Sequence, residues 1–171
     1  NKDDIVGLKD STTYTFRVSV MRGDKIVNGY WVSSVTEYQA STNMATGSWN
    51  GNDNTLFYPT TDGSVKAGYS GGLAIFYTML NYDSSKGGLL RFTTKLENGG
   101  TYAVKAGTDV YNDSVTLVPD GNTEGTLTFD LSRMGMASGN YYLRFYLAQN
   151  GTIMSLSNVY FYSNPQNLAR A

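Results

Sequence analysis

The sequence predicts an all-β protein, a jelly-roll β-sandwich of two antiparallel sheets. Short segments in which apolar and polar residues alternate recur along nearly the whole chain, and turns rich in Gly, Asn, Asp and Ser separate them. Only residues 131–138 could form a helical turn, and a glycine interrupts that stretch. Many short strands with regular turns are typical of a sandwich or a jelly roll.

The first two predicted strands are residues 12–21 and 26–35. In the first, Tyr14, Phe16, Val18 and Val20 would form the inward face. The triplet Arg-Gly-Asp at 22–24 lies between the two strands. It could serve as an integrin ligand, but it stands where a hairpin needs a turn, and Gly-Asp is ordinary turn chemistry. We therefore interpret it as a turn.

Residues 39–55 have no periodicity and are predicted to be a loop. The segment 71–82 is apolar on both faces, which predicts a buried central strand. The other predicted strands are 55–58, 64–69, 88–96, 101–105, 114–118, 125–131, 140–149 and 152–162. We expect one domain over residues 1–163, followed by a linker at 164–171, where the alternation is lost.

Composition excludes several functions. The chain has 171 residues and a net charge of −1, so it offers one core and no basic surface for nucleic acid. Its longest apolar run, 72–80, is too short to span a bilayer. The sequence has no Cys and therefore no disulfide or thiolate metal site. It also has no His, which excludes a Ser-His-Asp or Cys-His nucleophile within this chain.

The predicted strand 140–149 has an unusual second face. Its first face is apolar, whereas the second carries Tyr142, Arg144 and Tyr146. Such a face could pack against a loop or a neighbouring module. It could also bind a saccharide, because aromatic rings stack on the C–H face of a sugar while polar tips and Arg hydrogen-bond its hydroxyls.

The predicted strand 152–162 would place Val159 and Phe161 in the core, with Asn158, Tyr160 and Tyr162 facing outward. The short turn "NGT" between the two strands predicts a hairpin, which would bring both outward faces together. Trp49, in a Gly/Asn-rich loop, either packs at the edge of the sandwich or contacts a ligand. The candidate sugar-binding residues are Trp49, Tyr142, Arg144, Tyr146, Asn158 and Tyr160.

Carboxylates give only weak signals. Asp109 and Asp113 could lie close together, as the two carboxylates of a glycosidase do. The segments 52–54 and 82–88 offer oxygen ligands of the kind that Ca²⁺ prefers, without the spacing of an EF-hand loop. We therefore expect no enzymatic activity and no cofactor, and a structural calcium ion is left open.

The segment "GLKDSTTYTFRVSVM", residues 7–21, resembles a segment of bacteriophage tail modules, where it opens part of a carbohydrate-binding-module-like jelly roll. The ending "NPQNLARA" resembles the start of a further tail or sugar-binding module. The resemblance implies an adhesion module in a distal tail or baseplate protein of a siphophage that infects Gram-positive bacteria. Such a module would be extracellular, on the virion tail, and would bind host cell-wall polysaccharide.

The resemblance also implies neighbouring modules of a parent tail protein as partners, and we expect the isolated domain to be a monomer. We expect neither nucleic acid nor a membrane as a partner. The predicted function is non-catalytic carbohydrate binding. The alternative is a structural or assembly spacer module without a sugar ligand.

Overall fold

The structure is a computed structural model that describes residues 13–23, 25–35, 39–41, 43–112, 115–148 and 151–163. Side chains are described at 41, 43–112, 115–148 and 151–163. The predicted linker 164–171 lies outside these ranges, so the predicted domain boundary stays a prediction. Within the described part, no helix is long and apolar enough to cross a membrane.

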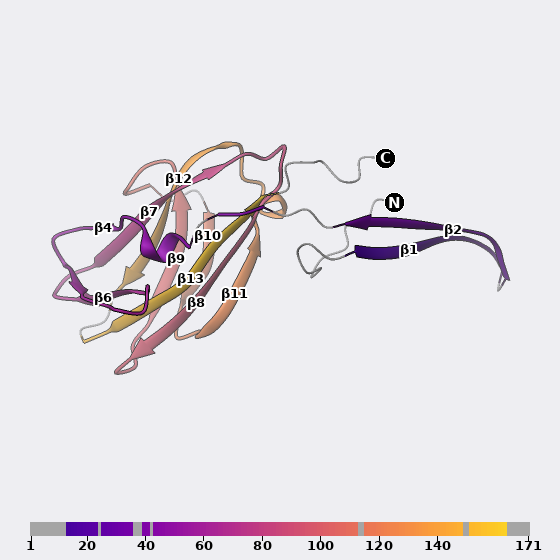
Figure 1. Cartoon of the computed structure of the whole chain (residues 1–171). Helices are drawn as coiled ribbons and strands as arrows, with labels where there is room; N and C mark the ends of the chain where they lie inside the picture. Colours follow the sequence, from indigo (N-terminus) through magenta and orange to yellow (C-terminus); the bar gives the residue numbers. More distant parts are fainter. Residues whose placement is uncertain are drawn as a thin grey trace.

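The first two strands form an antiparallel hairpin, as predicted. Strand β1 (Thr13–Arg22) pairs with β2 (Lys25–Val35), and the pair Arg22–Lys25 closes the hairpin at the Arg-Gly-Asp triplet. This confirms the turn interpretation. The hairpin is a two-stranded sheet of its own, drawn in indigo in Figure 1. The inward face predicted for 12–21 concerns side chains outside the described set.

The remaining strands form two antiparallel sheets that pack as two layers, which confirms the predicted β-sandwich (Figure 1). The five-stranded sheet has the order β10-β9-β12-β7-β4, with β4 at Asn50–Gly51, β7 at Ala74–Tyr82, β9 at Tyr102–Gly107, β10 at Val115–Gly121 and β12 at Gly139–Leu147. The six-stranded sheet has the order β11-β8-β13-β6-β5, with β3 on β13; its strands are β3 at Gln39–Ala40, β5 at Thr55–Tyr58, β6 at Val65–Tyr69, β8 at Leu89–Glu97, β11 at Gly125–Asp130 and β13 at Ile153–Ser163.

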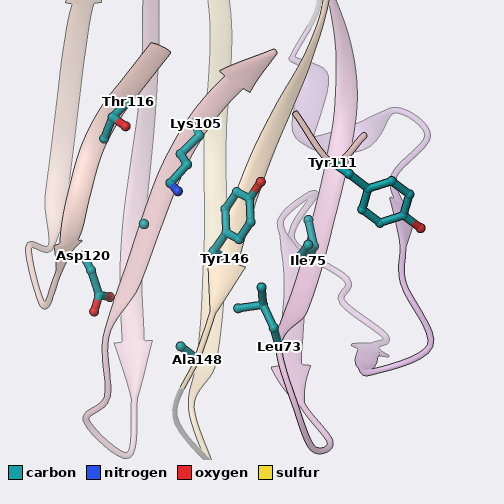
Figure 2. A pocket seen from close by; sticks show the side chains of 9 residues that line it. Leu73, Ile75, Lys105, Tyr111, Thr116, Asp120, Tyr146 and Ala148 are labelled. Carbon is teal, nitrogen blue, oxygen red and sulfur yellow. The ribbon is translucent and has the colours of Figure 1, made fainter. Parts of the chain in front are cut away.

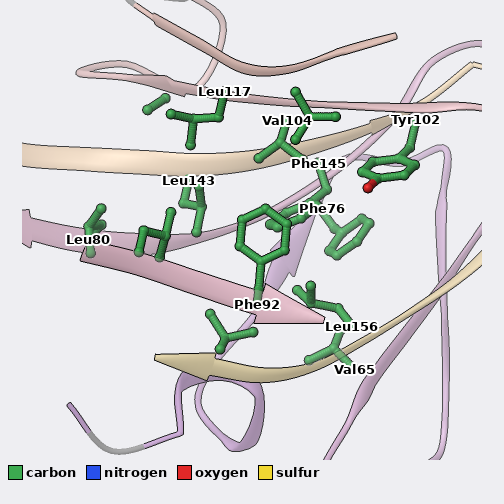
Figure 3. Packing of buried hydrophobic residues seen from close by; sticks show 14 of the residues in the cluster. Val65, Phe76, Leu80, Phe92, Tyr102, Val104, Leu117, Leu143, Phe145 and Leu156 are labelled. Atoms are coloured by element: carbon green, nitrogen blue, oxygen red, sulfur yellow. The ribbon is translucent and has the colours of Figure 1, made fainter. Parts of the chain in front are cut away.

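An aromatic cluster joins the two sheets at the centre of the core (Figure 3). The rings of Phe76 on β7 and Phe145 on β12 stack with centroids 5.1 Å apart. Phe92 on β8, in the other sheet, meets Phe145 edge-on at 5.4 Å. All three side chains are fully buried. These inward positions are those that alternation along each strand predicts.

Short elements end and connect the strands. The 3₁₀-helix η2 (Leu131–Met134) is the single helical turn expected at 131–138, and it ends at Gly135 in the left-handed conformation, φ 70°. A second 3₁₀-helix, η1 (Met44–Thr46), and the two-residue strands β3 and β4 lie in the segment predicted to be a loop. Strand β7 is buried at its start, but Met79 on its outer face is 46% exposed, so the prediction of a fully buried strand holds only in part.

The predicted hairpin between 140–149 and 152–162 is wrong. Strand β12 pairs with β7 and β9, whereas β13 pairs with β8, β6 and β3 in the other sheet. The chain crosses from one sheet to the other after β12. Alternation determines which residues of a strand face inward, but it is the same whether the next strand pairs in a hairpin or lies in the other sheet. The outward faces of β12 and β13 therefore lie on opposite sides of the sandwich.

Candidate functional site

A groove of about 640 Å³ lies on the outer face of the five-stranded sheet. Its lining comes from β7, β9, β10 and β12 and from the loop that joins β9 to β10 (Figure 2). The lining residues are Leu73, Ile75, Ala103, Lys105, Tyr111, Thr116, Asp120, Tyr146 and Ala148. The volume lies within the range of about 300–1,000 Å³ that is usual for ligand sites.

The floor of the groove runs across the strands. Ala103 on β9, Tyr146 on β12 and Ile75 on β7 occupy the same register position on three neighbouring strands. Figure 2 shows the lining side chains side by side from β10 to β7. Four strands set about 4.8 Å apart span about 14 Å, so an extended ligand could cross the sheet over this floor.

Tyr146 is the aromatic centre of the floor. The Nζ atom of Lys105 lies 5.0 Å from the centroid of its ring, and the guanidinium carbon of Arg144 lies 5.8 Å from it. Cations at these distances are attracted to the ring face. Lys105 is partly exposed and adds a cation to the surface around the Tyr146 ring, whereas Arg144 contacts the ring from a buried position.

Tyr111 stands on the loop between β9 and β10, and its side chain is 76% exposed. Asp109 accepts hydrogen bonds from the Tyr111 backbone N–H (2.7 Å) and from Asn112 Nδ2 (3.1 Å). These bonds, the backbone bond from Tyr111 first, hold the pKa of Asp109 below its usual value of 3.8. The carboxylate thus supports the loop in its charged form, and Tyr111 lines the edge of the groove with its ring largely exposed.

The border of the groove at Leu73 and Ile75 depends on Asn52. Its Nδ2 donates to the carbonyl of Leu73 at 2.7 Å, and its Oδ1 accepts from the backbone N–H of Ile75 at 3.0 Å. The hydroxyl of Thr55 donates to the same Oδ1 at 2.9 Å. One side chain therefore ties the segment before β5 to the start of β7, where both apolar lining residues stand.

Tyr142 and Tyr146 both lie on the predicted outward face of β12, and both are partly exposed. Tyr146 lines the groove, whereas Tyr142 packs edge-on against Tyr77 with ring centroids 5.5 Å apart. The prediction of a direct sugar contact by Arg144 needs correction. Its side chain is 0% exposed, because the loop between β9 and β10 covers it and accepts its hydrogen bonds.

Tyr160 and Asn158 belong to the six-stranded sheet, so the prediction that they share a face with Tyr142 is wrong. Val159 is fully buried, as predicted, because a bulge between Ser157 and Tyr160 resets the alternation. Asn158 adopts a positive φ of 52° at this bulge and is exposed. Tyr160 instead neighbours Tyr162, with ring centroids 6.1 Å apart.

Trp49 packs at the edge of the sandwich, which was one of its two predicted roles. Its indole N–H donates to the Met44 carbonyl at 3.0 Å. Its ring lies 5.6 Å from Phe76 and 5.8 Å from Phe145, on the inner side of the five-stranded sheet. The tryptophan therefore extends the core cluster rather than the groove.

Residue patterns did not predict eight of the lining residues: Leu73, Ile75, Ala103, Lys105, Tyr111, Thr116, Asp120 and Ala148. Alternation along 101–105 places Lys105 outward, a signal that could have been used. The segment that contains Tyr111 stands out in the sequence only for its carboxylates. No local pattern predicts that it folds back over β12, because the contacts with Arg144 join residues far apart in the chain.

Of the two carboxylates that could have formed a glycosidase pair, Asp113 lies outside the described residues. Asp109 has a lowered pKa, which is the opposite of what a general acid needs. In the predicted calcium segments, Asn52 and Asn54 both donate to the Leu73 carbonyl, and Asp83 accepts from the Ser85 backbone N–H and hydroxyl. Among the described residues, no group of three or more His, Cys, Asp or Glu is placed to hold a metal ion.

No protein-family model matches the sequence, and no curated protein matches it. Solved structures do match. The CBM4 structure superposes with a TM-score of 0.53 at 14% identity, covering 74% of this chain and 95% of that chain. The fold is that of a carbohydrate-binding-module-like β-sandwich. A family 29 carbohydrate-binding module matches with a TM-score of 0.45 at 15% identity, over 90% of each chain. A variant of such a module complexed with cellulohexaose matches with a TM-score of 0.44 at 16% identity, over 89% of this chain and 92% of that chain.

Proposed function

We propose that the protein binds carbohydrate without cleaving it, and that the groove on the five-stranded sheet is the binding site. The observation that carries the proposal is the pairing of two tyrosines, Tyr146 on the floor and Tyr111 on the wall, within one groove. Their rings would stack on sugar C–H faces. Lys105, Thr116 and Asp120 would hydrogen-bond the hydroxyls along the groove.

The ligand we propose is a polysaccharide chain lying across the strands. The floor crosses three strands in register, and the lining extends to a fourth, which makes the site longer than one sugar ring. The likeness to carbohydrate-binding modules agrees with this function at the level of the fold.

The biological setting we propose is adhesion of a phage tail to the cell-wall polysaccharide of a Gram-positive host. This part rests on the resemblance of residues 7–21 and of the C-terminal "NPQNLARA" to tail modules. The module would then act outside the cell, next to other modules of its parent protein. Many copies on one tail would raise the avidity of a weak single site.

The test is titration of the purified chain with cellulohexaose and with purified Gram-positive cell-wall polysaccharide, after a glycan array. We expect wild-type binding with a Kd of about 0.1–1 mM. Tyr146→Ala should weaken it about 2- to 12-fold, the equivalent of one stacked ring at about 0.5–1.5 kcal/mol. Tyr160→Ala, the matched control on the opposite sheet, should bind like the wild type.

The titration should be repeated in EDTA, where we expect unchanged affinity. Loss of binding that calcium restores would show a calcium-dependent site. The groove is the wrong site if Tyr146→Ala binds like the wild type, or if Tyr160→Ala weakens binding as much as Tyr146→Ala. Absence of binding across the array would refute carbohydrate binding itself.

A structural or assembly function is the second candidate, and one observation favours it. Leu56, Phe57 and Tyr58 on the edge strand β5 are 45%, 45% and 37% exposed. Apolar side chains on a sheet edge suit contact with a neighbouring module. A chain that fails to bind any glycan but associates with the adjoining modules of its parent protein would support this function.

A further inference from the structure

Arg144 combines an outward position with complete burial. Its neighbours across the sheet, Lys105 and Tyr77, are partly exposed, yet Arg144 itself is 0% exposed. The loop between β9 and β10 folds over it. Nη1 of Arg144 donates to the carbonyl of Val110 at 2.7 Å, and Nη2 donates to the carbonyl of Asn112 at 2.8 Å.

These two carbonyls flank Tyr111. The planar guanidinium fork therefore holds the carbonyl groups of the residues before and after Tyr111, whose own side chain is 76% exposed. Asp109 holds the backbone N–H of Tyr111 from a third direction at 2.7 Å. The backbone from Val110 to Asn112 is thus held at three points, and Tyr111 contributes to the lining of the groove.

Gly107 makes this close approach feasible. A Cβ at position 107 would overlap the carbonyl oxygen of Asn112 and Nη2 of Arg144. The glycine is buried at the end of β9, next to the first residues of the loop. Only a residue without a side chain lets the loop and the guanidinium pack against the sheet at this point.

Burying a guanidinium is expensive in free energy, and an apolar residue would fill the space beneath a loop without that cost. What an apolar residue or lysine could not do is donate two hydrogen bonds in a fixed fork. We propose that Arg144 is a positioning residue. It fixes the Tyr111 loop, so that the Tyr111 ring already lines the carbohydrate site before a ligand binds. This inference rests on the proposed function. A wall that is ordered before binding avoids the entropy cost of ordering it on binding.

The experiment compares two independent ways of displacing the loop, neither of which removes a groove residue. Arg144→Lys loses the fork, and Gly107→Ala forces the loop outward with Arg144 intact. Gly139→Ala at the start of β12 is the matched control, since its Cβ would meet nothing nearer than 3.8 Å. Each variant is titrated with cellulohexaose and with the cell-wall polysaccharide, alone and combined with Tyr111→Ala.

We expect Tyr111→Ala to weaken binding about 2- to 12-fold. Arg144→Lys and Gly107→Ala should each weaken it to a similar extent, and Gly139→Ala should not. Because Gly107→Ala acts through the Tyr111 loop, its double variant should bind no more weakly than Tyr111→Ala alone. Arg144→Lys also alters the contact of Arg144 with the Tyr146 ring, so its double variant is not held to that limit. Amide exchange at Tyr111 should be faster in both loop variants, at a temperature where each remains folded.

The proposal is overturned if Gly107→Ala is folded and binds like the wild type, or if its loss multiplies with that of Tyr111→Ala, which would show an effect not exerted through Tyr111. Gly107→Ala decides the matter should Arg144→Lys fail to fold. If the wild type binds neither probe nor any glycan on the array, the proposed function fails and this inference with it. If the wild type binds but the losses of Gly107→Ala and Tyr111→Ala multiply, only the positioning role is refuted.

Discussion

Strands β12 and β13 look alike in sequence, yet the two outer faces they belong to differ. Each strand alternates apolar residues with outward tyrosines. On β12, a loop covers the centre of the outward face and leaves a groove around Tyr146. On β13, Tyr160 and Tyr162 lie beside each other, with Arg91 of β8 in register.

The difference lies in what the rest of the chain adds to each face. One turn-rich segment, 108–112, folds back over β12 because Arg144 offers two donors and Gly107 leaves room for its backbone. Alternation along a strand defines a face, but a binding site also needs walls. The walls come from segments remote from the strand in sequence, so the same pattern of tyrosines acquires different surroundings on the two sheets.

The largest expected effect is on stability, and it distinguishes an inward residue of β12, Phe145, from an outward one, Tyr146. Phe145→Ala should lower the free energy of unfolding by about 3–5 kcal/mol, because it removes a fully buried ring from the cluster with Phe76 and Phe92. Tyr146→Ala, at the next position, should lower the free energy of unfolding by about 1 kcal/mol or less. Urea denaturation measures both values. Equal losses would mean that Tyr146 belongs to the core and that its face is not a binding surface.

A smaller effect is expected from replacing two asparagines, one beside the groove and one beside β13 in the other sheet. Asn52 supports the groove border at Leu73 and Ile75, whereas Asn43 Oδ1 accepts from the backbone N–H of Val159 at 3.0 Å, in the bulge of β13. Asn43 Oδ1 also accepts from the backbone N–H of Ala45 at 3.1 Å. Asn52→Ala, which loses three hydrogen bonds, and Asn43→Ala, which loses two, should each lower the free energy of unfolding by about 1–3 kcal/mol.

Only Asn52→Ala should also weaken binding of the cell-wall polysaccharide, since it loosens a border of the groove. Urea denaturation gives the first quantity, and calorimetric titration gives the second. If Asn43→Ala reduces affinity to the same degree, the binding surface extends to the six-stranded sheet, and the contrast between the faces is not functional.

Residue patterns predicted the strands well because alternation and turn chemistry are local. The inward residues of β12, the buried Val159 and the short helical turn before Gly135 all follow from positions a few residues apart. The pairing of β12 and β13 did not follow, because a short turn can close a hairpin or cross between sheets. Of the nine residues that line the groove, alternation predicted only Tyr146, and the approach of Tyr111 depends on a contact between residues more than thirty positions apart.

The smallest expected effect is on how stability changes at low pH. Hydrogen bonds lower the pKa of Asp109, chiefly the one from the Tyr111 backbone, and Arg144 adds to the shift. Asp62 and Asp83 have lowered pKa values as well, first through the hydroxyls of Ser64 and Ser85. A carboxylate whose folded pKa lies below 3.8 stabilises the fold above that pH and ceases to do so as the pH falls through the folded pKa.

Asp109→Asn should therefore be less stable than the wild type at pH 7, and the difference should shrink as the pH falls below 3.8. The amide oxygen can still accept the Tyr111 N–H, so polysaccharide affinity at pH 7 should fall less than in Tyr111→Ala. Urea denaturation at a series of pH values measures the first effect. A difference that is constant with pH would mean that the charge of Asp109 does not stabilise the loop, and that the fork of Arg144 holds Tyr111 without it.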